Sequence, residues 1–186
     1  VNIGGQEPDS PLTHLRKLGI PEVAGSVPAL YVPSAKERAI RLQRSLMAAH
    51  SWYETQLNIH VPIALAILDS ETQKKISPNV GPFSLFAQGG PGLVVLPDRM
   101  PPGQPPAGSD RDHSAGGILQ GEHTLFHEDG HILTNFLKIW SGNRFVNELT
   151  AGMFMAADIG AKRPDLNYVL EDRRQGRRPK PPRHPA

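Results

Sequence analysis

The chain has 186 residues, of which 38% are hydrophobic, and a formal net charge of +2, so it is long enough for a single domain with its own core. It contains no cysteine, which excludes disulfides, thiol nucleophiles and cysteine metal ligands and leaves only nitrogen and oxygen donors for any metal. No apolar run approaches 18 residues, so we expect no membrane span.

Residues 1–33 are predicted to form an irregular N-terminal arm. Glycines and prolines are frequent there and apolar residues show no period, as in a segment that wraps over a domain or remains from a propeptide. The chain opens at Val1 with neither methionine nor a signal peptide. The sequence is thus expected to be a processed mature form or a trimmed one, and the absence of cysteine favours a secreted or periplasmic protein.

A long helix is predicted over residues 34–57. Ser34 and Glu37 have the spacing of a capping box, and apolar side chains then recur at steps of three and four residues. These side chains are Ala35, Ala39, Leu42, Leu46, Ala49, Tyr53 and Leu57. One face of this helix is therefore expected to pack on the core.

Three short apolar runs follow and predict strands, at residues 61–68, 83–87 and 93–97. The next segment, residues 98–117, is rich in proline and glycine and predicts a long loop that borders the functional site as a lid or is disordered. Within it, Asp110 to His113 has two readings: a second ion or substrate contact, or a solvated charge cluster.

The strongest functional pattern is His127-Glu128-Asp129-Gly130-His131, an H-E-x-x-H motif inside an apolar-periodic run. Two imidazoles four residues apart lie on one face of a helix and can bind one zinc ion, and Glu128 can then act as a general base on a water molecule. Gly130 costs about 1 kcal/mol in a helix relative to alanine, which predicts the close approach of another backbone.

A catalytic zinc needs a third protein ligand. The metzincin pattern would place a histidine at position 137, which is a leucine. Glu148 fits better, because residues 145–154 predict a second apolar helix and an antiparallel hairpin turning near residues 140–143 would set Glu148 level with His131. The alternative is a structural acid paired with an arginine such as Arg144.

These residues resemble the gluzincin zinc metallopeptidases, which pair His-Glu-x-x-His with a downstream Asn-Glu-x-x-Ala. The likeness covers about residues 120–164. It implies zinc as cofactor, with His127, His131 and Glu148 as ligands and Glu128 as general base. Only 16 residues separate His131 from Glu148 and Gly152 replaces an acid of the thermolysin-like pattern, so the resemblance is to the superfamily.

The resemblance implies a peptidase that hydrolyses peptide bonds of a peptide or protein substrate. In such enzymes an edge strand beside the zinc helix pairs with the substrate backbone. We assign this edge to residues 92–96, with four residues contacting substrate: Gly92, Leu93, Val94 and Val95. The alternative is an ordinary interior strand.

The sequence leaves other roles open. Asn147 either binds the substrate backbone or caps its helix, and three residues are candidates to stabilise an oxyanion: Tyr168, His113 and His123. Two competing functions are a non-catalytic zincin scaffold that binds metal or a protein partner, and a hydrolase of non-peptide amides. The glutamate between the two histidines argues against a purely structural metal site.

The expected fold class is α+β and zincin-like, with a small mixed or antiparallel sheet packed against the metal helix and further helices. The domain is expected to span residues 34–170 and to include a short helix near 165–173. The Arg- and Pro-rich residues 171–186 have the composition of a disordered tail. Residues 162–186 carry eight basic against three acidic side chains, but without interleaved aromatics after Tyr168 we expect no nucleic-acid partner.

Overall fold

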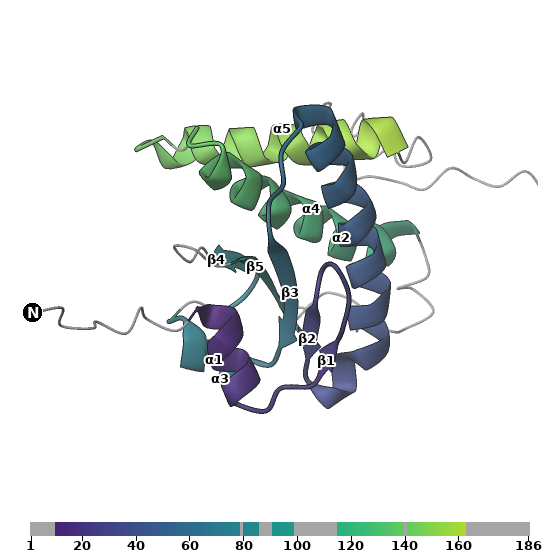
Figure 1. Cartoon of the computed structure of the whole chain (residues 1–186), viewed down its shortest axis with the longest axis vertical. Coiled ribbons are helices and arrows are strands. Elements are labelled where there is room, and N and C mark those ends of the chain that lie inside the picture. Colours follow the sequence, from purple (N-terminus) through teal and green to yellow (C-terminus); the bar gives the residue numbers. More distant parts are fainter. Residues whose placement is uncertain (1–9, 79, 86–90, 99–114, 140, 163–186) are drawn as a thin grey trace, which may run out of the picture.

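A computed structural model describes residues 10–78, 80–85, 91–98, 115–139 and 141–162. These residues form helices and a small mixed sheet, which confirms the predicted α+β class. Figure 1 shows the long helices α2 (Lys36–Leu57), α4 (Ala115–Phe136) and α5 (Arg144–Lys162) gathered on one side of the molecule. No helix in these described residues is long and apolar enough to cross a membrane.

The sheet has the order β1-β2-β3-β5-β4. Its strands are β1 (Glu22–Val23), β2 (Ala29–Tyr31), β3 (Ile63–Leu68), β4 (Phe83–Leu85) and β5 (Gly92–Pro97). The three inner strands are parallel to one another, while β1 and β4 pair antiparallel at the two edges. The three apolar runs predicted as strands are therefore confirmed as β3, β4 and β5.

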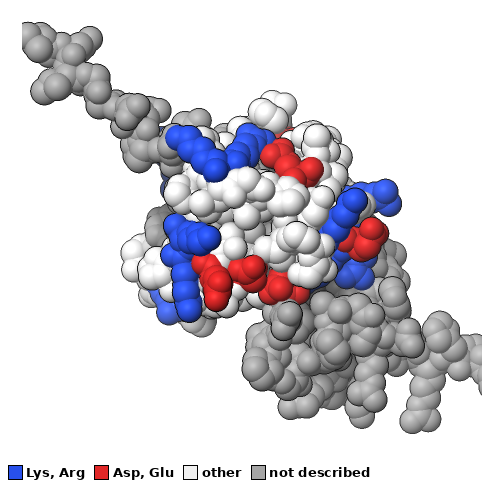
Figure 2. Space-filling view, turned by 90° about the horizontal axis from the view of Figure 1, so that it is seen from below, with Lys and Arg blue, Asp and Glu red and all other residues white. Residues whose placement is uncertain are grey.

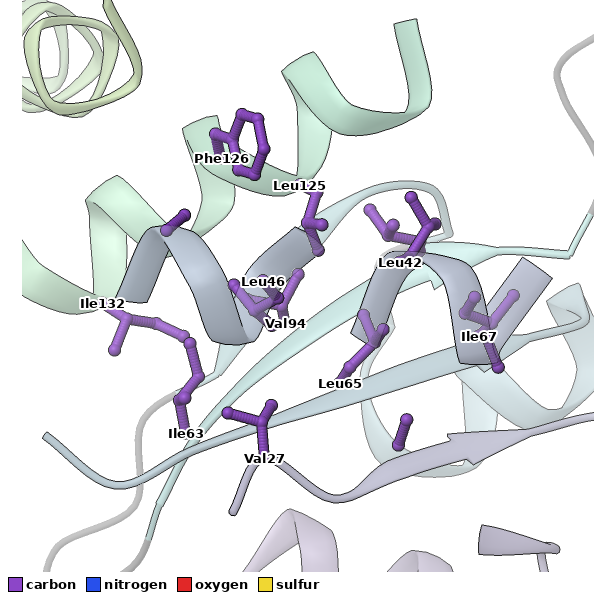
Figure 3. Close-up of a cluster of buried hydrophobic side chains, with 14 of the residues drawn as sticks. Val27, Leu42, Leu46, Ile63, Leu65, Ile67, Val94, Leu125, Phe126 and Ile132 are labelled. Carbon is purple, nitrogen blue, oxygen red and sulfur yellow. The ribbon is translucent and has the colours of Figure 1, made fainter. Parts of the chain in front are cut away.

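Both faces of the central strand β3 are buried, which explains its uninterrupted apolar sequence. Ile63, Leu65 and Ile67 point into the core beneath α2 and α4, which Figure 3 shows. The alternate residues of β3 belong to a second core that includes two leucines of the short helix α1 (Pro11–Lys17). The helices thus cover the sheet on both sides.

The predicted irregular arm is wrong for residues 11–31, which contain α1 and the first two strands. Ser10 caps α1 by accepting a 3.2 Å bond from the Thr13 amide, and Pro11 follows at the first helical position. Strands of two and three residues are too short to show a period of two in the sequence. The Ser10-Pro11 pair was the signal that could have found the helix.

Helix α2 ends at Leu57 as predicted, but the capping box at its start is wrong. A 3-10 turn, Pro33–Ala35, precedes the helix, so Ser34 lies inside this turn and the helix has no side-chain cap. The predicted core face is confirmed for its central residues, whereas Leu57 is exposed. The sequence reading also missed the short helix α3 (Ser70–Ile76), whose first turn is capped by Asp69.

Helix α4 begins at Ala115, so the last three residues of the predicted loop are helical. The rest of that loop, residues 99–114, lies outside the described residues, as do the predicted helix near 165–173 and the tail 171–186. The predicted hairpin is confirmed: α4 ends at Phe136 and α5 begins at Arg144. Tyr53 of α2 donates a hydrogen bond to the Phe154 carbonyl of α5 and so ties the hairpin to the domain.

Charges are mixed over the described surface. Figure 2 shows the molecule from below the view of Figure 1, and on this face lysine and arginine side chains lie beside aspartate and glutamate. Among the described residues, this face therefore carries no extended patch of one sign.

Candidate metal site

The two motif histidines lie on one face of α4. Their positions differ by four residues, which is close to one helical turn, and their ring centroids are 4.8 Å apart with the planes at 85°. Each Nε2 can therefore point to a common point beside the helix. This part of the site follows from helix geometry alone.

Glu148 of α5 completes the group. Its Oε2 lies 3.1 Å from His127 Nε2 and 3.6 Å from His131 Nε2. The structure thus brings together the three residues predicted to bind metal, and we call them the open trio because the Glu148 side chain is 46% exposed. Arg144 lies 3.9 Å from the other carboxylate oxygen and is 93% exposed, so this surface pair contributes little.

Gly130 permits the close approach of α5 to α4. A Cβ atom at this position would lie 2.6 Å from the Ala151 carbonyl oxygen and 2.9 Å from the Ala151 Cα. The expected backbone neighbour of Gly130 is therefore confirmed as Ala151. Because Ala151 lies three residues after Glu148, the same contact sets how far Glu148 stands from the histidines.

The donor set fits a zinc ion. Zinc bonds of about 2.1 Å in a tetrahedron place neighbouring ligand atoms about 3.4 Å apart, between the two oxygen–nitrogen distances of the trio. Burial is the largest influence on the pKa of His131. Burial and the charge of His127 lower this pKa, whereas Glu128 and Glu148 raise it. The lowering effects are larger, so the pKa of His131 lies below its usual value. The neutral imidazole that a metal requires is thus favoured.

Glu128 faces the sheet and is 8% exposed. Its Oε2 accepts a 2.6 Å hydrogen bond from Ser84 Oγ on β4, and its backbone carbonyl lies 2.9 Å from the same hydroxyl. Glu128 is also close enough for its charge to act on the pKa of His131. Glu128, the predicted base, therefore lies next to the trio, and Ser84 of the edge strand β4 holds its carboxylate.

The opposite side of the motif contains a second histidine–carboxylate group, which the sequence reading missed. Asp129 is fully buried, and its Oδ1 lies 2.9 Å from His50 Nδ1 on α2. His50 Nε2 donates to the Val61 carbonyl at 2.7 Å. We call His50 and Asp129 the closed pair. Burial raises the pKa of Asp129 despite its bond to His50.

Asn147 does not have the predicted substrate-binding role. Its side chain is 3% exposed, and it pairs with the Ser141 backbone through two 2.8 Å bonds, accepting from the amide and donating to the carbonyl. Both hydrogen-bonding groups of the side-chain amide are therefore occupied. Asn147 instead holds the turn that precedes Glu148.

The predicted substrate edge is also wrong. β5 lies between β3 and β4 and pairs with both, so Leu93, Val94 and Val95 have a partner strand on each side, while Gly92 pairs with Ile63 of β3. A Cβ atom at Gly92 would lie 2.7 Å from Ile132 Cγ2 of α4, so the glycine permits the close packing of α4 on β5. The edge strand beside α4 is β4.

The candidate residues for oxyanion stabilisation stay untested. Tyr168 and His113 lie outside the described residues, and His123 lies in α4 with its side chain outside them. Of the residues that the sequence reading missed, Ser84 and His50 had no local signal, because their partners lie 44 and 79 positions away.

Comparisons of the chain with known protein families, with curated proteins and with solved structures gave no match. The functional proposal therefore rests on the geometry of the site.

Proposed function

We propose that the protein is a zinc-dependent hydrolase of peptide bonds, a small metallopeptidase of gluzincin type. The observation that supports this proposal is the convergence of His127 Nε2, His131 Nε2 and Glu148 Oε2 with Glu128 next to them on the same helix. A purely structural metal site has no use for a base in that place, whereas hydrolysis requires one.

His127, His131 and Glu148 would hold the metal. Zinc in such a set keeps one open position, polarises a carbonyl group and lowers the pKa of a bound water to about 7. Glu128 takes the proton of the attacking water and then delivers it to the leaving nitrogen, which suits an amide. Its burial against Ser84 keeps bulk water from competing for this carboxylate.

The substrate is expected to bind along β4. This strand pairs antiparallel with β5 on one side only, and within the described part of the chain it is the sheet edge nearest to α4. A peptide that adds as a further strand gains main-chain hydrogen bonds there. Because Ser84 of β4 contacts Glu128, the added peptide would run past the general base.

The test compares four proteins for zinc content and peptide cleavage. The wild type should bind one zinc and cleave peptides, and Glu128→Gln should keep the zinc but lose about 10²- to 10⁴-fold in kcat. Glu148→Gln should lose the zinc. Arg144→Ala, one helical turn before Glu148, is the control and should retain both properties. Elemental analysis and a quenched-fluorescence peptide library provide the two readouts.

Each failure has a distinct meaning. If the wild type binds no zinc at the trio, the whole proposal is contradicted. A wild type that binds zinc without cleaving any peptide contradicts the enzymatic function and favours the non-catalytic scaffold. Loss of zinc from Arg144→Ala to the same extent as from Glu148→Gln would contradict the ligand assignment.

A further inference from the structure

Ser84 lies where the edge of the sheet meets the general base. In β4 the neighbours Phe83 and Leu85 pack into the core on the α1 side of the sheet. Side chains alternate along a strand, so Ser84 points to the other face, toward α4. A polar residue thus occupies the one position of this short strand that faces the metal helix, and its partner there is Glu128.

The hydroxyl has one proton and two nearby acceptors. Its distance to Glu128 Oε2 is 2.6 Å and its distance to the Glu128 carbonyl is 2.9 Å. The shorter distance is typical of a hydroxyl that donates to a carboxylate, and the carbonyl belongs to a helix whose carbonyls accept from amides four residues later. The proton is therefore assigned to the carboxylate.

We infer that Ser84 is a positioning residue for Glu128. This inference rests on the proposed function, because it assigns Ser84 a role only if Glu128 is the base. The bond engages Oε2 and restricts the side-chain torsions of Glu128, leaving Oε1 as the oxygen that takes the proton. Since Ser84 belongs to the strand expected to pair with substrate, base and substrate backbone are placed by the same three residues.

The chain offers a matched control in Ser45. Its Oγ donates a 2.9 Å bond to Glu122 Oε1, and Glu122 is another buried glutamate of α4 that does not belong to the motif. Ser45→Ala and Ser84→Ala each remove one serine hydroxyl from one buried carboxylate of the same helix. A general disturbance of α4 would lower kcat in both variants. Loss of the positioning of Glu128 would lower kcat only in Ser84→Ala.

In the zinc-loaded enzyme, Ser84→Ala should lower kcat by about 10- to 100-fold, as loss of an orienting partner does, with KM and zinc content unchanged. Ser84→Thr retains the hydroxyl on a residue suited to a strand and should restore kcat to within about threefold of the wild type. Ser45→Ala should leave kcat unchanged. A kcat in Ser84→Ala equal to that of Ser45→Ala would overturn the inference.

A second readout needs neither zinc nor activity. The side-chain carboxyl ¹³C resonance of Glu128 in the metal-free protein should move in Ser84→Ala and stay in place in Ser45→Ala. An unmoved resonance in Ser84→Ala shows that the contact is absent and overturns the inference. If the wild type neither binds zinc nor cleaves peptides, the proposed function fails, while this resonance still decides whether Ser84 holds Glu128.

Discussion

Two histidine–carboxylate groups lie on different sides of the same turns of α4. In the closed pair, Asp129 has no exposed surface and His50 gives both ring nitrogens to protein partners. In the open trio, one carboxylate oxygen of Glu148 lies within 3.6 Å of two imidazoles and the side chain reaches solvent. The residue types are alike, but their surroundings differ.

The difference shows what separates a structural contact from a ligand set. A buried histidine–carboxylate contact between two helices, here α2 and α4, contributes by joining elements of the fold. Three donor atoms that converge at a half-exposed point leave a place for a cation and for a substrate. The closed pair is thus expected to govern stability and the open trio to govern metal binding.

Removal of one carboxylate from each group should give the largest contrast. Asp129→Ala leaves His50 buried without its partner and should lower the free energy of unfolding by about 3–5 kcal/mol. Glu148→Ala removes an exposed carboxylate and should change it by less than about 0.5 kcal/mol. Urea unfolding of the metal-free proteins measures both values. Equal losses of unfolding free energy in the two variants would show that the closed pair does not stabilise the fold more than the open trio.

Two glycines on facing helices sharpen the comparison, because Gly130 lies at the contact between α4 and α5 and Gly152 does not. Gly130→Ala inserts a methyl group against Ala151, and the overpacking should cost about 1–3 kcal/mol, more than the gain of about 1 kcal/mol in helix propensity. The displaced α5 should also weaken zinc binding. Urea unfolding and zinc titration measure the two effects.

Gly152→Ala is the control for this prediction. A Cβ atom at Gly152 of α5 would meet nothing within 4 Å, so alanine should stabilise the helix by up to about 1 kcal/mol and leave zinc affinity unchanged. If both variants shifted stability in the same direction, close packing at Gly130 would not be what sets the distance between α4 and α5.

The smallest expected effect is a pH dependence of the closed pair. Burial alone would lower the pKa of His50, but its bonds to Asp129 and Val61 and the charges of Asp129 and Glu54 together raise it above 6.5. Above about pH 6.5 the unfolded imidazole loses its proton while the folded one retains it. Stability is therefore complete below pH 6.5 and falls as the pH rises through the folded pKa, by at most about 1.4 kcal/mol per unit.

Comparison of metal-free wild type with His50→Gln tests this contribution, because the titrating groups outside the closed pair are common to both proteins. The stability difference between them should be constant from roughly pH 5 to 6.5 and shrink at higher pH. A difference that stays constant to roughly pH 9 would mean that the retained proton of the closed pair does not stabilise the fold.

Sequence reasoning succeeded where a feature is local. The helix over residues 36–57 and the strands β3 and β5 are long enough to show their period, and the open trio follows from helix spacing plus the symmetry of one hairpin. Sequence reasoning failed where a feature depends on which elements lie side by side in space. Nothing in the run 92–97 indicates which strands lie beside it, so the sequence does not distinguish an inner strand from an edge strand.

The same distinction explains the residues that were missed. Ser84 and His50 act through partners far along the chain, and a single polar residue in an apolar segment does not name its partner. The first two strands escaped notice because two or three residues in a segment rich in proline and glycine carry no pattern. For Asn147 the sequence indicates two possible roles, and its contact with Ser141 shows that it holds the turn.

The sequence separations of the two groups also bear on how the molecule assembles. His127 and Glu148 are 21 positions apart, whereas His50 and Asp129 are 79 apart. Closing the shorter loop costs about 1 kcal/mol less chain entropy, and it needs only a helical hairpin rather than the finished sheet. If the proposed metal binds, we expect it to hold α4 and α5 together before α2 packs against α4.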